Sequence, residues 1–206
     1  MPRKYLLLLT VALGVIFLDQ WTKYLVVREL TTRFDDKPTV GERLSAMYSE
    51  PPPQGFYGLH LQPKRHIEIS ESFFRLRYAE NPGAAWGLFR NLPPDVRGPL
   101  FHVVSIGAVV LITWYFSRLS GKDPRERWAL YGLPLVLGGA IGNYIDRLAR
   151  AFVIDFLEAH WYDKAAWPSF NVADSAIVVG VGLLLVDAFV RKEEKASPEK
   201  SAEVRP

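Results

Sequence analysis

The stretch LGGAIGNYIDRLARAFVIDFLEAHWYDKAAWPSFNVAD, residues 137–174, lies between two strongly apolar segments and carries an unusual set of carboxylate and amide side chains. Asn143, Asp146 and Arg147 stand at positions i, i+3 and i+4, so on a helix they share one face. Charged groups at membrane depth are costly, and by default they mark a functional site. We therefore expect the rest of the chain to form a frame around these side chains.

Four apolar runs are each long enough to cross a membrane, because a helical span needs about 20 residues. The predicted spans cover approximately residues 5–27, 99–119, 128–147 and 172–190. The first run follows two cations, as in a cleavable signal peptide, but no small-x-small cleavage site closes it. We expect it to remain as a transmembrane helix, and we predict an all-α membrane protein built on a four-helix bundle.

The bulk composition excludes several classes of function. The chain has no cysteine, which rules out disulfides and cysteine-based nucleophiles or metal sites. Its basic residues flank the apolar runs instead of forming one surface, which argues against a nucleic-acid partner. At 206 residues the chain suits one domain. We expect a single membrane domain over approximately residues 1–195 and a charged, disordered tail over residues 191–206.

The segment between the first two spans is polar. Residues 31–66 are rich in proline and glycine and are predicted to form an extended loop insertion. Apolar and polar side chains then alternate from Phe74 to Tyr78, which is typical of a strand. Asn81-Pro82-Gly83 predicts a turn, followed by a short amphipathic segment at the membrane interface. Residues 148–169, between the last two spans, are expected to form a second external loop.

The orientation follows from the short basic segments. Arg3 and Lys4, the cations from Arg118 to Arg127, and those that follow the last span all belong on one side. With four spans, that side is the cytoplasm under the positive-inside rule. Both termini are then cytoplasmic, and the insertion and the acidic stretch lie near the outer face of the membrane.

Asp155 and Asp174 are the candidate catalytic pair. If the last two spans are antiparallel neighbours, the connection between them can bring the two carboxyls face to face. Two close carboxyls cannot both ionise easily, so one keeps a proton. The ionised partner can then activate water while the protonated one acts as an acid. Asp146 with Asp174 is a conceivable alternative, but Asp146 adjoins Arg147 and is expected to be a permanently charged support.

Two other classes of function remain open from these residues. A transporter or proton-conducting protein would use the same aspartates as relay groups. A non-enzymatic membrane scaffold would use them to fix helix packing. Asp19 and Lys23, at i and i+4 in the first span, are either an interfacial pair at the helix end or a support for the site.

Four stretches resemble the prolipoprotein signal peptidase family (signal peptidase II), which are bacterial aspartic-type membrane proteases. They are LDQWTK (18–23), ENPGAAWGLF (80–89), GGAIGNYIDR (138–147) followed by VIDF (153–156), and FNVADSAI (170–177). Their order, spacing and topology agree with the family, and the four spans cover most of the chain. The chain departs from the family mainly between Thr31 and Arg65, where the insertion is longer than the expected compact connection.

The resemblance implies cleavage of diacylglyceryl-modified prolipoproteins immediately before the lipidated cysteine, at the outer face of the bacterial cytoplasmic membrane. It implies no metal or organic cofactor, and a monomer in contact with lipid is expected. It adds to the bundle a small extracytoplasmic β-cradle and a lid, over approximately residues 67–96. It makes Asp155 and Asp174 catalytic. It assigns binding or supporting roles to Asn81, Gly83, Asn143, Asp146, Arg147, Asn171, Ala173 and Asp19. Lys23, at i+4 from Asp19, is a further candidate for a supporting role.

Overall fold

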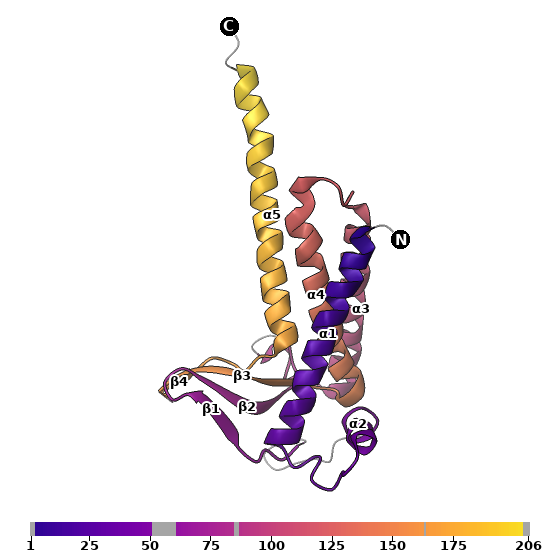
Figure 1. The fold of residues 1–206 in the computed structure, drawn as a ribbon, viewed down its shortest axis with the longest axis vertical. Helices are drawn as coiled ribbons and strands as arrows, with labels where there is room; N and C mark the ends of the chain where they lie inside the picture. The colour runs from indigo at the N-terminus through magenta and orange to yellow at the C-terminus, as the bar shows by residue number, and fades with distance from the viewer. Residues whose placement is uncertain (1–2, 51–60, 85–86, 163, 204–206) are drawn as a thin grey trace.

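The computed structural model describes residues 3–50, 61–84, 87–162 and 164–203, the part beyond Val190 for its backbone only. Its elements are α1 (Arg3–Leu30), α2 (Val40–Tyr48), β1 (His66–Ser70), β2 (Phe74–Asn81), α3 (Pro94–Arg118), the 3₁₀ helix η3 (Pro124–Glu126), α4 (Arg127–Arg150), β3 (Val153–Trp161), β4 (Ala165–Ala166) and α5 (Val172–Glu203). Figure 1 shows α1, α3, α4 and α5 side by side, with the sheet and α2 near one end of the bundle. Both chain termini lie toward the opposite end.

Four helical segments are long and apolar enough to cross a membrane: Arg3–Leu30, Pro94–Arg118, Pro124–Arg150 and Val172–Val190. The central one contains α4, which packs against α1, α3 and α5. Glycines let these helices approach closely. A Cβ added to Gly138 would lie 2.8 Å from Val15 Cβ of α1, and one added to Gly132 would lie 2.8 Å from the Gly180 carbonyl oxygen of α5.

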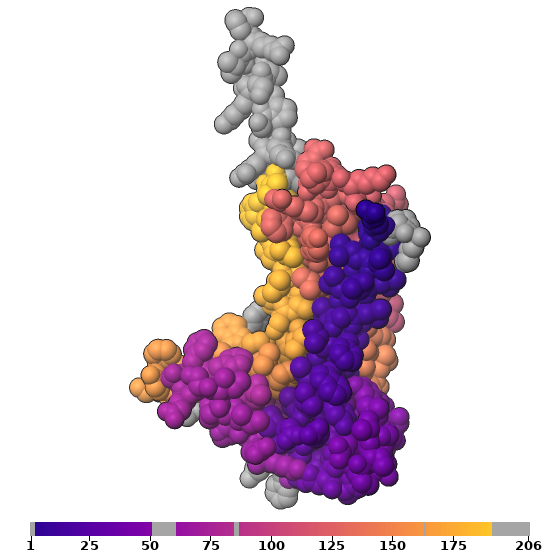
Figure 2. All heavy atoms as spheres, viewed as in Figure 1, coloured from indigo at the N-terminus to yellow at the C-terminus, as the bar shows by residue number. Residues whose placement is uncertain are grey.

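The sheet joins segments that are far apart in the sequence. It is antiparallel with the order β1-β2-β3-β4, and the register pairs Ala79 with Asp155 and Asn81 with Val153. Figure 2 shows the sheet, in magenta and orange, projecting sideways from the lower part of the bundle. The strand predicted from Phe74 is therefore present. The fold as a whole combines a helical bundle with a sheet and is not all-α.

The expectation of an external loop over residues 148–169 is wrong, because β3 occupies Val153–Trp161. Its first four residues are all buried. A strand buried on both faces shows no alternation of apolar and polar residues, so the pattern that revealed β2 was missing here.

The insertion is not an extended loop throughout, because it contains α2. Thr39 caps this helix: its side chain accepts a hydrogen bond from the Glu42 N–H, and the Glu42 carboxylate accepts one from the Thr39 N–H. This reciprocal capping box starts a helix despite the surrounding prolines. Residues 51–60, which include three of those prolines, lie outside the described residues.

One further expectation concerns the C-terminal tail. The backbone of α5 continues to Glu203, through the tail that we expected to be disordered. The tail is rich in Glu, Lys and Ala, which have high helix propensity.

In the predicted interfacial segment, Ala85 and Trp86 lie outside the described residues, and turns flank them: the Ala84 N–H donates to the Leu88 carbonyl.

Two buried apolar clusters hold these parts together. One lies between α1, α3 and α4, and its buried members include Phe116 and Leu133. The other joins the end of α1, the insertion and the sheet; its buried members are Tyr24, Val26, Val27, Leu30, Phe34, Ala46, Met47, Leu61, Tyr78, Phe152, Ile154 and Phe156. The second cluster connects the sheet firmly to the helical bundle, next to the acidic residues singled out in the sequence.

Candidate active site

Asp174 stands in the first turn of α5, and its position is fixed by the residue that caps this helix. The Asn171 side-chain oxygen accepts a hydrogen bond from the Asp174 N–H at 2.9 Å. In return, the Asn171 N–H donates to the Asp174 carboxylate at 3.2 Å. This is the reciprocal geometry of a capping box, built here from Asn and Asp. The carboxylate is therefore held at the start of α5, where it is partly exposed.

The same Asn171 side chain reaches Asp155 on β3. Its Nδ2 donates to Asp155 Oδ1 at 2.8 Å. A second amide holds the other carboxylate, because Asn143 Nδ2 on α4 donates to Asp174 Oδ1 at 2.8 Å. The two amides also contact each other, with Asn171 Nδ2 lying 3.1 Å from Asn143 Oδ1. Residues from α4, β3 and the start of α5 thus converge on one small polar cluster.

Asp155 is only 2 % exposed, and its environment disfavours the charged form. Burial raises the pKa of Asp155 to about 8, and the nearby charge of Asp174 adds to the rise. Hydrogen bonds from the Asn81 and Asn171 side chains and the charge of Lys23 oppose it. At neutral pH, Asp155 therefore keeps a proton beside a second carboxyl group.

Lys23 lies between two carboxylates behind this pair. Its ammonium is 2.8 Å from Asp19 Oδ2 and 2.9 Å from Asp146 Oδ2, and all three side chains are 0 % exposed. Asp19 and Lys23 do pair, as their spacing predicted. Their complete burial excludes the alternative of an interfacial pair at the helix end.

The two buried carboxylates also hold the backbone beside each candidate catalytic residue. Asp19 Oδ1 accepts the N–H of Ala173, the neighbour of Asp174, at 3.0 Å. Asp146 Oδ2 accepts the N–H of Ile154, the neighbour of Asp155, at 3.0 Å. Lys23 therefore links the two backbone segments that carry the acidic pair.

Asp146 is an ion-paired support, but its partners differ from the one expected. They are Lys23 and Arg150, whose Nη2 lies 2.7 Å from Asp146 Oδ1. Arg147 follows Asp146 directly and points elsewhere, because consecutive residues on a helix do not face each other. The sequence interpretation missed Arg150, although its i, i+4 spacing from Asp146 could have indicated it.

Gln20 was also missed. Its side-chain nitrogen donates to Asp19, to Asp146 and to the Gly142 carbonyl oxygen, at 3.0 to 3.1 Å. Gln20 thus satisfies acceptors on both buried carboxylates. No spacing rule indicates such a contact, because Gly142 and Asp146 are more than 120 residues away.

Arg147 faces the turn after β2. Its Nη2 donates to the Gly83 carbonyl oxygen at 3.0 Å, and its guanidinium lies 4.6 Å from the centre of the Phe101 ring. The Asn81 side-chain oxygen accepts the N–H of Gly83 at 3.0 Å, as in an Asx turn. A Cβ at Gly83 would lie 2.6 Å from the Leu88 carbonyl oxygen, so only glycine fits here.

The predicted site residues therefore come together in three connected groups. Asp155, Asp174, Asn143 and Asn171 form the acidic centre, and Asn81 lies beside Asp155. The others form the buried support and the Arg147–Gly83 contact at the margin. Among the residues that the structure describes, no group of three His, Asp or Glu side chains is placed to hold a metal ion.

Comparison with known proteins identifies relatives along most of the chain. The family model for signal peptidase (SPase) II matches residues 11–190. A lipoprotein signal peptidase of Anaeromyxobacter sp. (strain Fw109-5) is 42% identical over 189 residues, covering 89% of this chain and 84% of the relative. The lipoprotein signal peptidase of Syntrophotalea carbinolica is 37% identical and covers 89% and 91%.

A solved structure of a bacterial membrane enzyme shares the fold. Its TM-score is 0.63 at 23% sequence identity, over 91% of this chain and 90% of the other. The four apolar helices and the lipoprotein signal peptidase relatives together support a multi-pass bacterial membrane protein. The length of the family match and the identity to its relatives are decisive, and the chain belongs to the signal peptidase II family.

Proposed function

We propose that the protein is a membrane-embedded aspartic endopeptidase that removes the signal peptide from diacylglyceryl-modified prolipoproteins, just before the lipidated cysteine. The observation that carries the mechanism is that Asn171 binds both Asp155 and Asp174, while burial and Asp174 keep Asp155 protonated. Membership of the signal peptidase II family and the names of the relatives support the substrate class.

The two carboxyls take complementary roles in this proposal. Ionised Asp174 removes a proton from a water molecule, whose oxygen attacks the carbonyl carbon of the peptide bond. Protonated Asp155 donates its proton to the carbonyl oxygen as the tetrahedral diol forms. When the diol collapses, Asp174 passes its proton to the leaving nitrogen, the C–N bond breaks, and a hydroxyl proton returns to Asp155. Both residues then regain their starting states.

The amides keep the pair oriented through the cycle. Asn143 and Asn171 each donate to one carboxylate, so neither acid can rotate freely. A fixed orientation saves the reorganisation that the same groups would need in water. Arg147, Asn81 and Gly83 form the margin of the site and are the proposed contacts for the extended peptide backbone of the substrate.

The orientation in the membrane follows from charge. The start of α1 and the end of α3 lie at the end of the bundle opposite the sheet (Figure 1). These segments carry Lys4 and Arg118, and Lys4 Nζ donates to the Leu119 carbonyl oxygen just after α3. We place that end in the cytoplasm under the positive-inside rule. The acidic pair then opens at the outer face of the cytoplasmic membrane, where a diacylglyceryl group can remain in the lipid. In this proposal the enzyme acts as a monomer without metal or organic cofactor.

The test is cleavage of a purified prolipoprotein in two forms, with and without the diacylglyceryl group, by the detergent-solubilised protein. Mass spectrometry of the products locates the cut. We expect release of the signal peptide from the modified form only, with the lipidated cysteine as the new N-terminus. Failure to cut the modified form, or a cut at another bond, would contradict the proposal and favour a relay or scaffold role for the aspartates.

A further inference from the structure

The strand that carries Asp155 has two differently occupied faces. Side chains alternate along a strand, so Asp155 points to one face while Ile154 and Phe156 point to the other. On that second face, Ile154 and Phe156 belong to the buried cluster to which the insertion contributes Ala46 and Met47 of α2, with Phe34 and Leu61 from its flanks. The insertion therefore packs directly behind the strand that presents the proposed acid.

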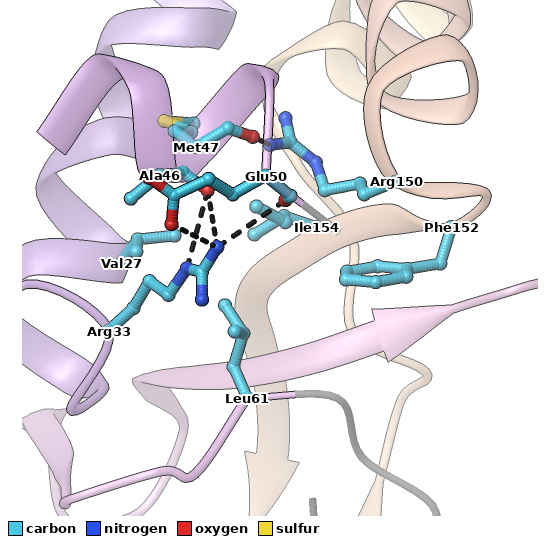
Figure 3. A pocket seen from close by; sticks show the side chains of 9 residues that line it. All are labelled: Val27, Arg33, Ala46, Met47, Glu50, Leu61, Arg150, Phe152 and Ile154. Carbon is cyan, nitrogen blue, oxygen red and sulfur yellow. Dashed lines mark hydrogen bonds and ion pairs between the residues drawn. The ribbon is translucent and has the colours of Figure 1, made fainter. Parts of the chain in front are cut away.

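Two arginines hold the last turn of α2 from opposite sides. Arg33 Nη2 donates to the Ala46 carbonyl oxygen at 2.8 Å, and Arg150 Nη1 donates to the Met47 carbonyl oxygen at 2.8 Å. Figure 3 shows both guanidinium groups at the pocket between α2, β3 and Leu61. The carbonyls at a helix C-terminus lack intrahelical partners and carry partial negative charge, so cations bind there favourably. This end of α2 is thus fixed in place.

Arg150 connects α2 to the backbone beside Asp155. While Nη1 binds Met47, Nη2 binds Asp146 Oδ1 at 2.7 Å. The other oxygen of Asp146 accepts the Ile154 N–H at 3.0 Å. One guanidinium and one carboxylate therefore join the end of α2 to the residue that precedes the proposed acid.

A second connection runs through Tyr48, the last residue of α2. The Tyr48 hydroxyl donates to Gln20 Oε1 at 2.9 Å, and Gln20 Nε2 donates to Asp146 Oδ1 at 3.1 Å. The Tyr48 ring also lies under the Arg150 guanidinium, 5.4 Å from ring centre to Cζ. Both connections pass through Asp146. Each begins at α2 and ends at the backbone of β3.

We propose that α2 is a positioning element of the active site: Tyr48 of α2, and Arg150 of α4, which binds the end of α2, act through Asp146 to fix the β3 backbone and thereby the Asp155 carboxyl relative to Asp174. This inference rests on the proposed peptidase function. It gives the insertion a catalytic purpose beyond stability: a misplacement of about 1 Å can cost on the order of 100-fold in rate. Tyr48 and Arg150 do not touch substrate and are positioning residues.

Two conservative variants test the proposal, each with a matched control. Arg150→Lys keeps a positive charge near Asp146, but a single ammonium cannot reproduce the two-pronged contact with Met47 and Asp146. Its control is Arg43→Lys, the same change on α2, where Arg43 binds the Lys37 carbonyl away from Asp146. Tyr48→Phe removes one hydroxyl, and its control is Tyr131→Phe on the exposed side of α4.

We expect kcat to fall about 10-fold or more in Arg150→Lys and about 3- to 10-fold in Tyr48→Phe, with KM unchanged, because binding groups at the margin of the site are untouched. Both controls should keep wild-type kcat. Hydrogen–deuterium exchange provides a readout independent of catalysis: the β3 amides around Ile154 should exchange faster in the two variants and at the wild-type rate in the controls.

The outcomes separate the two proposals. Variants with a lower melting temperature but wild-type kcat would overturn the positioning role and leave α2 as a stabilising cap only. A wild-type protein that cuts no lipidated substrate would overturn the peptidase function, and unchanged exchange of β3 in both variants would overturn the α2–β3 connection separately. If Arg150→Lys does not fold, Tyr48→Phe decides, since it removes a single partly buried hydroxyl.

Discussion

Lys23 and Asp146 form an ion pair of 2.9 Å in which both side chains are completely buried. Asp146 in turn holds the backbone next to Asp155, and Asp19, the other partner of Lys23, holds the backbone next to Asp174. Buried ion pairs add little net stability, since desolvation offsets their attraction, and they are best attested as devices that fix one arrangement. Here the arrangement is the mutual placement of the two acidic residues.

Replacing Lys23 should be severe, because it leaves two buried carboxylates without their shared cation. We expect Lys23→Met to lower the free energy of unfolding by about 3–5 kcal/mol, measured by thermal unfolding in detergent. The exposed Lys122→Met serves as the control and should change little. Adding Asp19→Asn should recover part of the loss, and strict additivity of the two changes would contradict the network.

The proposed acid should weaken the fold. In the folded state the pKa of Asp155 is raised to about 8, against about 3.9 in an unfolded chain. Between those values the folded state holds a proton that the unfolded state lacks. Asp155 therefore costs no stability at low pH, and the free energy of unfolding falls as the pH rises towards about 8.

Asp155→Asn removes this pH dependence while keeping an oxygen to accept from Asn171. We expect the variant to be more stable than wild type at pH 7, by a few kcal/mol, since one pKa unit corresponds to about 1.4 kcal/mol. The gain in melting temperature should grow between pH 5 and pH 8. A gain that is constant over this range would show that Asp155 is not held neutral by the fold.

Catalysis should fail in alkaline solution for the same reason. Because the proposed acid must carry a proton, kcat/KM should decline about tenfold per pH unit above a value near 8, the pKa of Asp155. The profile is measured with a diacylglyceryl-modified prolipoprotein, with thermal unfolding at each pH to confirm that the protein is folded. A rate that stays level to pH 10 would exclude Asp155 as the acid.

The contact between α4 and α5 at the site should tolerate no added methyl group. A Cβ at Gly139 would lie 2.4 Å from the Ala173 carbonyl oxygen and 2.7 Å from Ile177 Cγ1. Gly139→Ala should therefore push the start of α5, with Asp174, away from α4, costing about 1–3 kcal/mol of stability and most of the activity. Gly107→Ala, with no neighbour within 4 Å, is the control.

Local patterns predicted much of this structure. The four apolar runs are present as helices, and the alternation from Phe74 predicted β2. The i, i+4 spacing predicted the pair of Asp19 and Lys23. These features depend on residues within a few positions of one another, where helix and strand periods directly set which side chains meet.

The remaining features depend on contacts between distant segments. β3 was not predicted because both faces of residues 153–156 are buried. One face lies against the acidic centre and the other against the insertion. The hydrogen bond from Arg150 to Met47 spans 103 positions, and no periodicity links them. α2 was overlooked because its Thr39–Glu42 capping box stands among prolines that normally indicate irregular structure.

The assignment of Asp155 and Asp174 as the catalytic pair is tested most directly by the cleavage of purified diacylglyceryl-modified prolipoprotein. The proteins compared are wild type, Asp155→Asn, Asp174→Asn and Asp146→Asn, each shown to be folded. We expect wild type to release the signal peptide, and Asp155→Asn and Asp174→Asn to be folded but inert. If Asp155→Asn still cuts while Asp146→Asn does not, the catalytic pair is Asp146 with Asp174, and the assignment of Asp155 is contradicted.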